Sequence, residues 1–241
     1  MPNANEYQAP RWTLRRAFLY LESLFFALFV ACDLTGRSLV FSSTVWKFSV
    51  IVLALFYVAF ELYQTKKGDK LFRRRLFLLF AMGMTLVSDV FLLVLDENYT
   101  VGVCTFFFAQ ILHALEIERS KKRALVSFSL RFGATAIVLI VLGFAKLFDP
   151  LYIAVAFYAP ELLGNLVEHL VGAFYNHGEE RTRSLILAVG FFLFFLCDLC
   201  VGLSNIGVTG VSIWIWIFYA PSQALIAISS GRFCHDKTES D

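Results

Sequence analysis

The stretch LFLLFAMGMTLVSDVFLLVL, residues 76–95, decides the fold of this chain, because it is apolar almost throughout and contains a single carboxylate, Asp89. About 20 consecutive apolar residues form a helix long enough to cross a hydrocarbon core roughly 30 Å thick. A second stretch, LILAVGFFLFFLCDLCVGL at residues 185–203, repeats the pattern with Asp198 as its one carboxylate. Each aspartate lies a similar distance beyond the polar residue that precedes its run, so both should lie at a similar membrane depth.

The composition extends this pattern to the whole chain. Of its 241 residues, 59% are hydrophobic and only 17% are charged, whereas soluble domains average about 25% charged residues. Apolar runs of membrane-crossing length recur with short loops between them, which predicts an all-α, polytopic transmembrane helical bundle forming a single integral membrane domain over residues 1–241. We expect about eight spans, at residues 17–35, 44–64, 74–95, 99–118, 124–148, 151–175, 184–204 and 211–230.

The basic residues predict the topology. Most of the 21 lysine and arginine residues lie near the ends of the chain or in alternate loops, above all in residues 66–75 and 119–123. Loops rich in lysine and arginine stay on the cytoplasmic side, so we expect both termini inside. The expected location is a cell inner membrane if the protein is bacterial, or an endomembrane if it is eukaryotic. Because the basic clusters flank spans and have no domain around them, we expect no nucleic-acid partner.

Carboxylates inside the membrane are the main candidates for function. A charge at the centre of a transmembrane helix costs about 2.5–3.5 kcal/mol, so it normally faces a cavity or a partner. Asp89 and Asp198 are therefore candidate catalytic residues, although each could instead lock helix packing. At comparable depth we expect four further polar residues, namely Lys47, Gln110, Glu161 and Gln223, as substrate contacts.

Each of these contacts has a purely structural alternative. Lys47 could extend to lipid headgroups, and the two glutamines could bridge helices. Pro160, next to Glu161, should break or kink its helix. Cys197 and Cys200 form a CxxC pattern, but without a second ligand pair they favour packing over metal binding, and we expect no metal and no cofactor.

Four short motifs resemble the YhhN family of multi-pass membrane proteins, the lysoplasmalogenases, in order and spacing over about residues 46–230. They are MTLVSDVFLL at 84–93, FFFAQILHAL at 106–115, FFLFFLCDLC at 191–200 and FYAPSQALIAIS at 218–229. The chain departs from the family pattern at several positions. Phe48 replaces a proline after Lys47, Ser88 replaces a glycine before Asp89, and Gln110 stands where histidine is common. His113 also falls where an aromatic residue is usual.

The resemblance implies hydrolysis of the vinyl-ether bond of a lysoplasmalogen, a lysophospholipid, with Asp89 and Asp198 as the catalytic pair. Vinyl ethers hydrolyse by protonation of a carbon atom to give an oxocarbenium ion, which water then captures. That chemistry suits one carboxylic acid and one carboxylate, as in glycoside hydrolysis. Lys47 would meet the lipid phosphate, and a phenylalanine-rich channel would take the chain.

Other function classes fit the sequence less well. An intramembrane aspartyl protease would need a GxGD motif, which the chain lacks. A metal-dependent lipid amidase would need several histidines facing one site, and only His113 and His169 lie within predicted spans. A retinal protein would need a lysine in the last two spans, and residues 184–204 and 211–230 contain none. The strongest alternative is a non-enzymatic transporter or sensor that uses the same aspartates to bind a proton or ligand.

Overall fold

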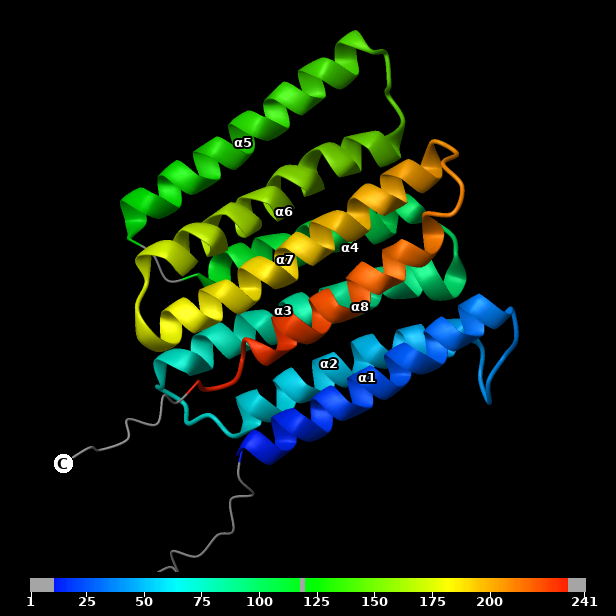
Figure 1. Cartoon of the computed structure of the whole chain (residues 1–241). Helices are drawn as coiled ribbons and strands as arrows, with labels where there is room; N and C mark the ends of the chain where they lie inside the picture. Colours follow the sequence, from blue (N-terminus) through cyan, green and yellow to red (C-terminus); the bar gives the residue numbers. More distant parts are fainter. Residues whose placement is uncertain (1–10, 118–119, 234–241) are drawn as a thin grey trace, which may run out of the picture.

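The computed structural model describes residues 11–117 and 120–233. Within these ranges the chain forms eight α-helices that lie side by side, and the only extended pairing is an isolated bridge between Leu39 and Phe41 (Figure 1). The helices are α1 (Arg11–Thr35), α2 (Ser43–Tyr63), α3 (Lys70–Asp89), α4 (Tyr99–Glu116), α5 (Lys121–Phe144), α6 (Pro150–Tyr175), α7 (Gly178–Asn205) and α8 (Ser212–Ile228), and α3 continues into a π-helix, η1 (Val90–Leu95). The predicted all-α bundle is confirmed.

Seven of these helices are long and apolar enough to cross a membrane, and α8, with 17 residues, is shorter. At 1.5 Å per residue α8 is about 26 Å long. Helices α1, α3 and α7 begin several residues before the predicted spans. Their first turns carry arginine and glutamate, which hydropathy assigns to loops although both residues favour the helix.

Both ends of the described chain lie at the same end of the bundle, where α1, α3, α5 and α7 begin and α2, α4, α6 and α8 finish (Figure 1). We call this the basic end, because the arginine- and lysine-rich segments lie there. Four helix starts, those of α2, α3, α5 and α6, are capped by serine or aspartate side chains that accept a backbone N–H, as at Asp69 and Asp149. Such caps satisfy donors that have no partner within the helix. The arrangement matches the predicted even number of crossings.

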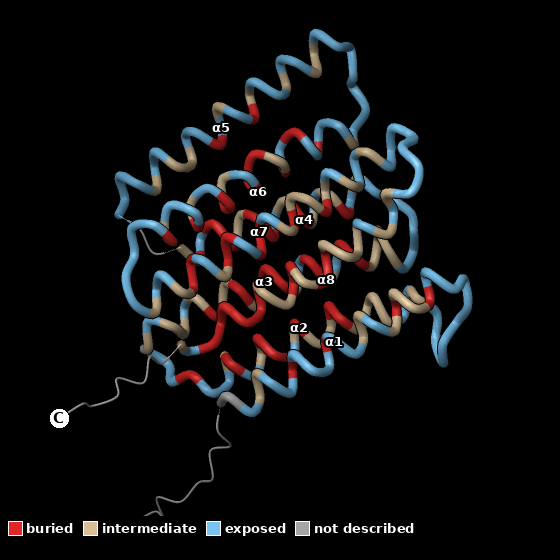
Figure 2. Tube along the Cα trace, in the orientation of Figure 1, coloured by how far each residue is buried: buried red, intermediate tan, exposed pale blue. Residues whose placement is uncertain are grey.

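Buried residues concentrate where α3, α4, α6, α7 and α8 face one another (Figure 2). Helix α5 lies at the edge of the bundle and packs mainly against α6 (Figure 1). Of its residues only Arg131 and Thr135 are buried, while apolar residues such as Leu125 and Phe132 face outward. An outward apolar face is what a lipid-exposed helix requires.

Two buried arginines hold the end of α8. Arg75 donates from Nε to the carbonyl of Ser230 at 2.7 Å, and its guanidinium also pairs with Glu61 at 2.8 Å. Arg183 donates to the carbonyls of Ser229 at 3.0 Å and Gly231 at 3.2 Å. These three carbonyls belong to the residues that directly follow α8, which ends at Ile228, so the arginines fix the chain where it leaves the helix. Sequence reasoning treated Arg75 as a loop residue and missed this role.

Helix α6 runs without interruption through Pro160, and α8 does the same through Pro221. Of the predicted break or kink at Pro160, the structure therefore excludes the break. A proline removes one backbone hydrogen bond, but neighbouring helices hold a membrane helix together across that gap.

Gly102 on α4 lets the π-helix pack closely. A Cβ atom at this position would lie 2.6 Å from the side chain of Leu92 in η1. In the preceding turn the hydroxyl of Ser88 donates to the carbonyl of Gly102 at 2.6 Å. The close approach of α4 therefore fixes the segment that follows Asp89.

Gly102→Ala should lower stability by about 1–3 kcal/mol, the usual cost of overpacking a filled core. Gly83→Ala on α3 is the matched control, because a Cβ atom there meets nothing within 4 Å. It should be neutral or slightly stabilising, since alanine favours the helix. Thermal unfolding of both variants in detergent measures the difference, and equal melting temperatures would contradict the close packing.

Candidate active site

Asp89 is the last residue of α3 before the π-helix. Its side chain is buried, and the hydroxyl of Tyr219 on α8 donates to its two carboxylate oxygens, at 2.9 and 2.7 Å. Single turns of π-helix occur frequently at functional sites, and here one begins directly after the carboxylate. The first aspartate therefore lies at the junction of α3, η1 and α8.

Asp198 lies on α7 and is half-buried. The hydroxyl of Tyr158 on α6 donates to its Oδ2 atom at 2.5 Å. Each aspartate thus accepts a hydrogen bond from a tyrosine on a different helix. These hydrogen bonds hold both carboxyl groups in place.

Aromatic rings join the two aspartate–tyrosine pairs. The centroid of Phe106 on α4 lies 6.0 Å from that of Tyr158 and 6.4 Å from that of Tyr219. Phe194 packs beside them, with its centroid 5.5 Å from that of Phe106 and 5.4 Å from that of Tyr219. We call Asp89, Tyr219, Phe106, Tyr158 and Asp198 the aspartate layer.

Sequence reasoning missed the two tyrosines, although a signal for them was present. The tetrapeptide FYAP occurs twice, at residues 157–160 and 218–221. Its tyrosine is Tyr158 in one copy and Tyr219 in the other, and these are the two residues that donate to the aspartates. A repeated tetrapeptide on two apolar helices therefore marks the partners that the buried carboxylates need.

Lys47 lies near the start of α2, at the end of the bundle opposite the basic end. Its ammonium group pairs with Asp33 at 2.8 Å and lies 5.1 Å from the ring centroid of Trp216. Trp216 in turn packs edge-on against Tyr219, with centroids 5.3 Å apart. The structure therefore places Lys47 beside the α8 side of the aspartate layer, and its role in substrate binding stays a prediction.

Gln223 is buried one turn after Tyr219 on α8. Its amide nitrogen lies 3.4 Å from the hydroxyl of the adjacent Ser222. Along α8, Gln223 therefore lies four residues from Tyr219, the member of the aspartate layer on this helix.

Gln110 and Glu161 make a different set of contacts, centred on Arg131 of α5. Arg131 pairs with Glu161 at 2.6 Å and donates to Asn165 Oδ1 at 3.0 Å. Asn165 donates to the side-chain oxygen of Gln110 at 2.9 Å. Arg131 also pairs with Glu168 at 3.2 Å. We call these five residues the Arg131 network.

The predicted polar layer thus divides in two. Lys47 and Gln223 lie toward the aspartates, whereas Gln110 and Glu161 are held by the Arg131 network, so their role as substrate contacts remains a prediction. A buried arginine requires acidic partners, and the arginine within the fifth apolar run was the sequence signal for this network.

Two pockets occur in other parts of the bundle, with volumes of about 670 and 550 Å³. Neither is lined by Asp89 or Asp198. Among the described residues, no three histidine, cysteine, aspartate or glutamate side chains are grouped so that they could hold a metal ion. What the aspartate layer offers is two carboxyl groups, two phenols and an aromatic lining.

The comparisons with known proteins agree with the motifs. The model of the YhhN family matches residues 42–230, a range that contains α2 to α8 and the whole aspartate layer. Comparison with curated proteins and with solved structures produced no match. Because the family model covers most of the chain, this protein belongs to the YhhN family.

Proposed function

We propose that this membrane protein hydrolyses the vinyl-ether bond of a lysoplasmalogen through Asp89 and Asp198. The observation that carries the proposal is the aspartate layer, in which two carboxyl groups, each hydrogen-bonded by a tyrosine, flank one aromatic cluster. Carboxylates inside a membrane span are costly and usually functional. The family resemblance supplies the substrate class.

The reaction requires two carboxyl groups in different protonation states. One aspartic acid donates its proton to the vinyl carbon distant from the ether oxygen, which leaves an oxocarbenium ion. The other aspartate stabilises this cation and accepts a proton from the water that adds to it. The resulting hemiacetal then collapses to a fatty aldehyde and a glycerophospho alcohol. This division of tasks parallels that of the two carboxyl groups in glycosidases.

The aromatic lining suits this intermediate. Phe106 lies between Tyr158 and Tyr219, and through them between the two aspartates. The face of an aromatic ring attracts a cation, by up to about 2 kcal/mol when both are desolvated. Phe106 and Phe194 would therefore stabilise the developing positive charge while excluding bulk water.

The surroundings of the layer suit a single-chain phospholipid. Asp198 is half-buried and its neighbour Leu199 is 50% exposed, so a lipid chain would enter from the membrane along α7. Lys47 lies beside Trp216, which packs against Tyr219 of the aspartate layer. In this position Lys47 would meet the phosphate. The ammonium group of Lys47 pairs with Asp33, so the phosphate would compete with Asp33 for this group.

Lipid-product analysis tests the proposal. Purified protein should release a fatty aldehyde from lysoplasmalogen and nothing from the matched lysolipid with a saturated ether, since only the vinyl ether can be protonated at carbon. If the wild-type protein releases no aldehyde, but the aspartates are needed for ligand binding or proton movement, the transporter or sensor function replaces the hydrolase.

Tyr158→Phe and Tyr219→Phe should each lower kcat by about 10-fold or more, because a hydrogen bond to a charged group is worth about 1.5–3 kcal/mol. KM should change little, since the phenols contact the aspartates rather than the lipid headgroup. Tyr152→Phe is the matched control, because Tyr152 lies on α6 with 47% of its surface exposed. Equal kcat values for all three variants would remove the tyrosines from the mechanism.

A further inference from the structure

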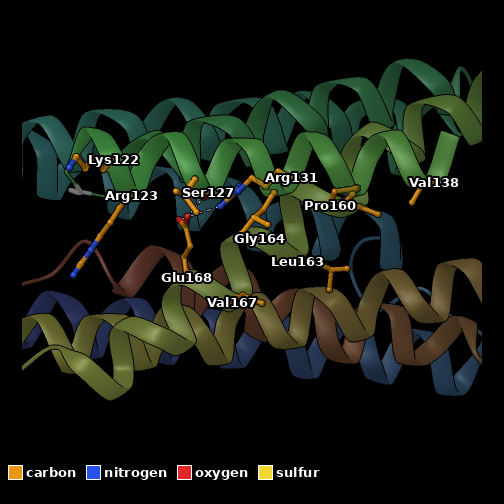
Figure 3. Close-up of a pocket in the computed structure, with 14 residues that line it drawn as sticks. Lys122, Arg123, Ser127, Arg131, Val138, Pro160, Leu163, Gly164, Val167 and Glu168 are labelled. Atoms are coloured by element: carbon orange, nitrogen blue, oxygen red, sulfur yellow. Dashed lines mark hydrogen bonds and ion pairs between the residues drawn. The ribbon is translucent and has the colours of Figure 1, made fainter. Parts of the chain in front are cut away.

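A groove of about 670 Å³ runs between α5 and α6, from the basic end toward the middle of the bundle. Most of its lining is apolar, including Val126, Leu130, Val138, Leu163 and Val167. Figure 3 shows Lys122 and Arg123 at one end of the groove and Val138 at the other. Its shape and lining suit a hydrocarbon chain with an anionic group at the basic end.

A polar pocket of about 550 Å³ opens at the same end, between α3, α4, α5, α6 and α7. Charged residues of both signs line it. The cationic residues are Lys70, Arg74, Arg123 and Arg183, and the acidic residues are Glu116, Glu168 and Glu180.

The groove and the polar pocket meet. Arg123, Val167 and Glu168 line both of them. A single ligand could therefore place a polar headgroup in the pocket and an apolar chain in the groove. The combined shape is that of an amphiphile, with Arg123 at the junction of its two parts.

Several charges of the pocket already have partners. Arg74 pairs with Glu180 at 2.8 Å, and Arg183 is bound to carbonyls at the end of α8. Lys70 and Arg123 have no ion pair among the residues that the structure describes. These two side chains offer the positive charge that a phosphate group needs.

Glu116 offers the complementary negative charge. Its side chain is 3% exposed, and its Oε2 atom has no hydrogen-bond partner within residues 11–117 and 120–233. The structure places Nδ1 of His113 at 3.7 Å from this carboxylate, too far for a hydrogen bond. A buried acceptor without a donor costs about 1–3 kcal/mol or more if charged, so a ligand that donates a hydrogen bond there would be stabilised.

We propose that the groove and pocket together bind a glycerophospholipid whose headgroup carries a phosphate and a primary amine. Lys70 and Arg123 bind the phosphate, Glu116 accepts a hydrogen bond from the ammonium group, and one acyl chain lies in the groove. A quaternary amine could not donate that hydrogen bond, so the site distinguishes the two kinds of headgroup.

This lipid site is separate from the aspartate layer. His169 lines the pocket and Tyr158 belongs to the layer, and both lie on α6. They are 11 positions apart in the sequence, which corresponds to about 16 Å along the helix. The bonds next to the phosphate of a lipid in the pocket would be out of reach of the aspartates. The site therefore binds lipid without cleaving it, independently of the proposed reaction.

Native mass spectrometry of the full chain, with phospholipids that share acyl chains but carry ethanolamine, choline or glycerol headgroups, tests the proposal. The ethanolamine lipid should bind most tightly. Arg123→Gln should weaken all three by about 10-fold, the loss of a charged hydrogen bond, whereas Lys121→Gln, which lines neither cavity, should not. Glu116→Leu, whose side chain cannot accept a hydrogen bond, should remove only the preference for the primary amine.

Ala134→Trp tests the groove, because Ala134 lines it while the exposed Ser129 on the same helix does not. Ala134→Trp should reduce lipid binding but leave binding of soluble glycerophosphoethanolamine unchanged, and Ser129→Trp should affect neither. The lipid site would be disproved if the wild type bound all three headgroups equally. It would also be disproved if soluble glycerophosphoethanolamine bound as tightly as the lipid. A change of oligomeric state in Ala134→Trp would instead make the groove a contact between subunits.

Discussion

Asp89→Asn and Asp198→Asn should each reduce aldehyde release by about 10²–10⁴-fold, the range that general acid–base catalysis contributes. Asparagine keeps the volume of the side chain and can accept the hydrogen bond from Tyr219 or Tyr158. It can neither donate a carboxyl proton nor stabilise a cation by charge. The rate of aldehyde release per folded protein, followed with purified variants, measures the effect.

The double variant should be scarcely worse than either single one, because groups that act together in one step are not additive. Asp96→Asn is the matched control, since Asp96 is an exposed residue at the end of the π-helix and accepts a hydrogen bond from Tyr99. It should retain full activity. A purely structural role for the aspartates would give the reverse pattern, in which the melting temperature falls while the surviving folded protein keeps its specific activity.

The fold was predictable because hydrophobic run length is a strong signal, and the run at residues 76–95 already contains the span and its aspartate. The errors lie where one residue's behaviour depends on its neighbours. Pro160 should end an isolated helix, but neighbouring helices hold α6 together. Helix α3 begins four residues before the predicted span, because Lys70 and Arg73, whose charge indicates a loop, form its first turn.

The site was predictable only in part, for a related reason. The cost of a carboxylate in a membrane identifies Asp89 and Asp198 from single positions in the sequence. Which side chains satisfy them depends on how helices pair, and tyrosine on an apolar helix is unremarkable by itself. Depth along a span also cannot distinguish the aspartate layer from the Arg131 network. Tyr158 and Glu161 are three residues apart on α6, yet Tyr158 contacts Asp198 on α7 and Glu161 pairs with Arg131 on α5.

Arg131 should be the residue on which attachment of α5 depends most. Its guanidinium pairs with Glu161 at 2.6 Å and its side chain is 3% exposed. Gly164 makes room for it, since a Cβ atom there would lie 2.5 Å from Nε of Arg131. Helix α5 buries little else, only Thr135, so this polar contact carries a large share of the α5–α6 interface.

Arg131→Met should therefore destabilise the protein by about 3–5 kcal/mol, the cost of leaving one member of a buried ion pair without its partner. The double variant Arg131→Met with Glu161→Gln should recover much of that loss, because no buried charge then remains at Glu161, while Glu168, which also pairs with Arg131, keeps its hydrogen bond from Ser127. Lys121→Met, at the exposed start of the same helix, should change little. Thermal unfolding and protease cleavage of α5 in detergent measure the three variants, and a double variant no more stable than Arg131→Met would show that packing of the arginine side chain, rather than its charge, holds α5 in place.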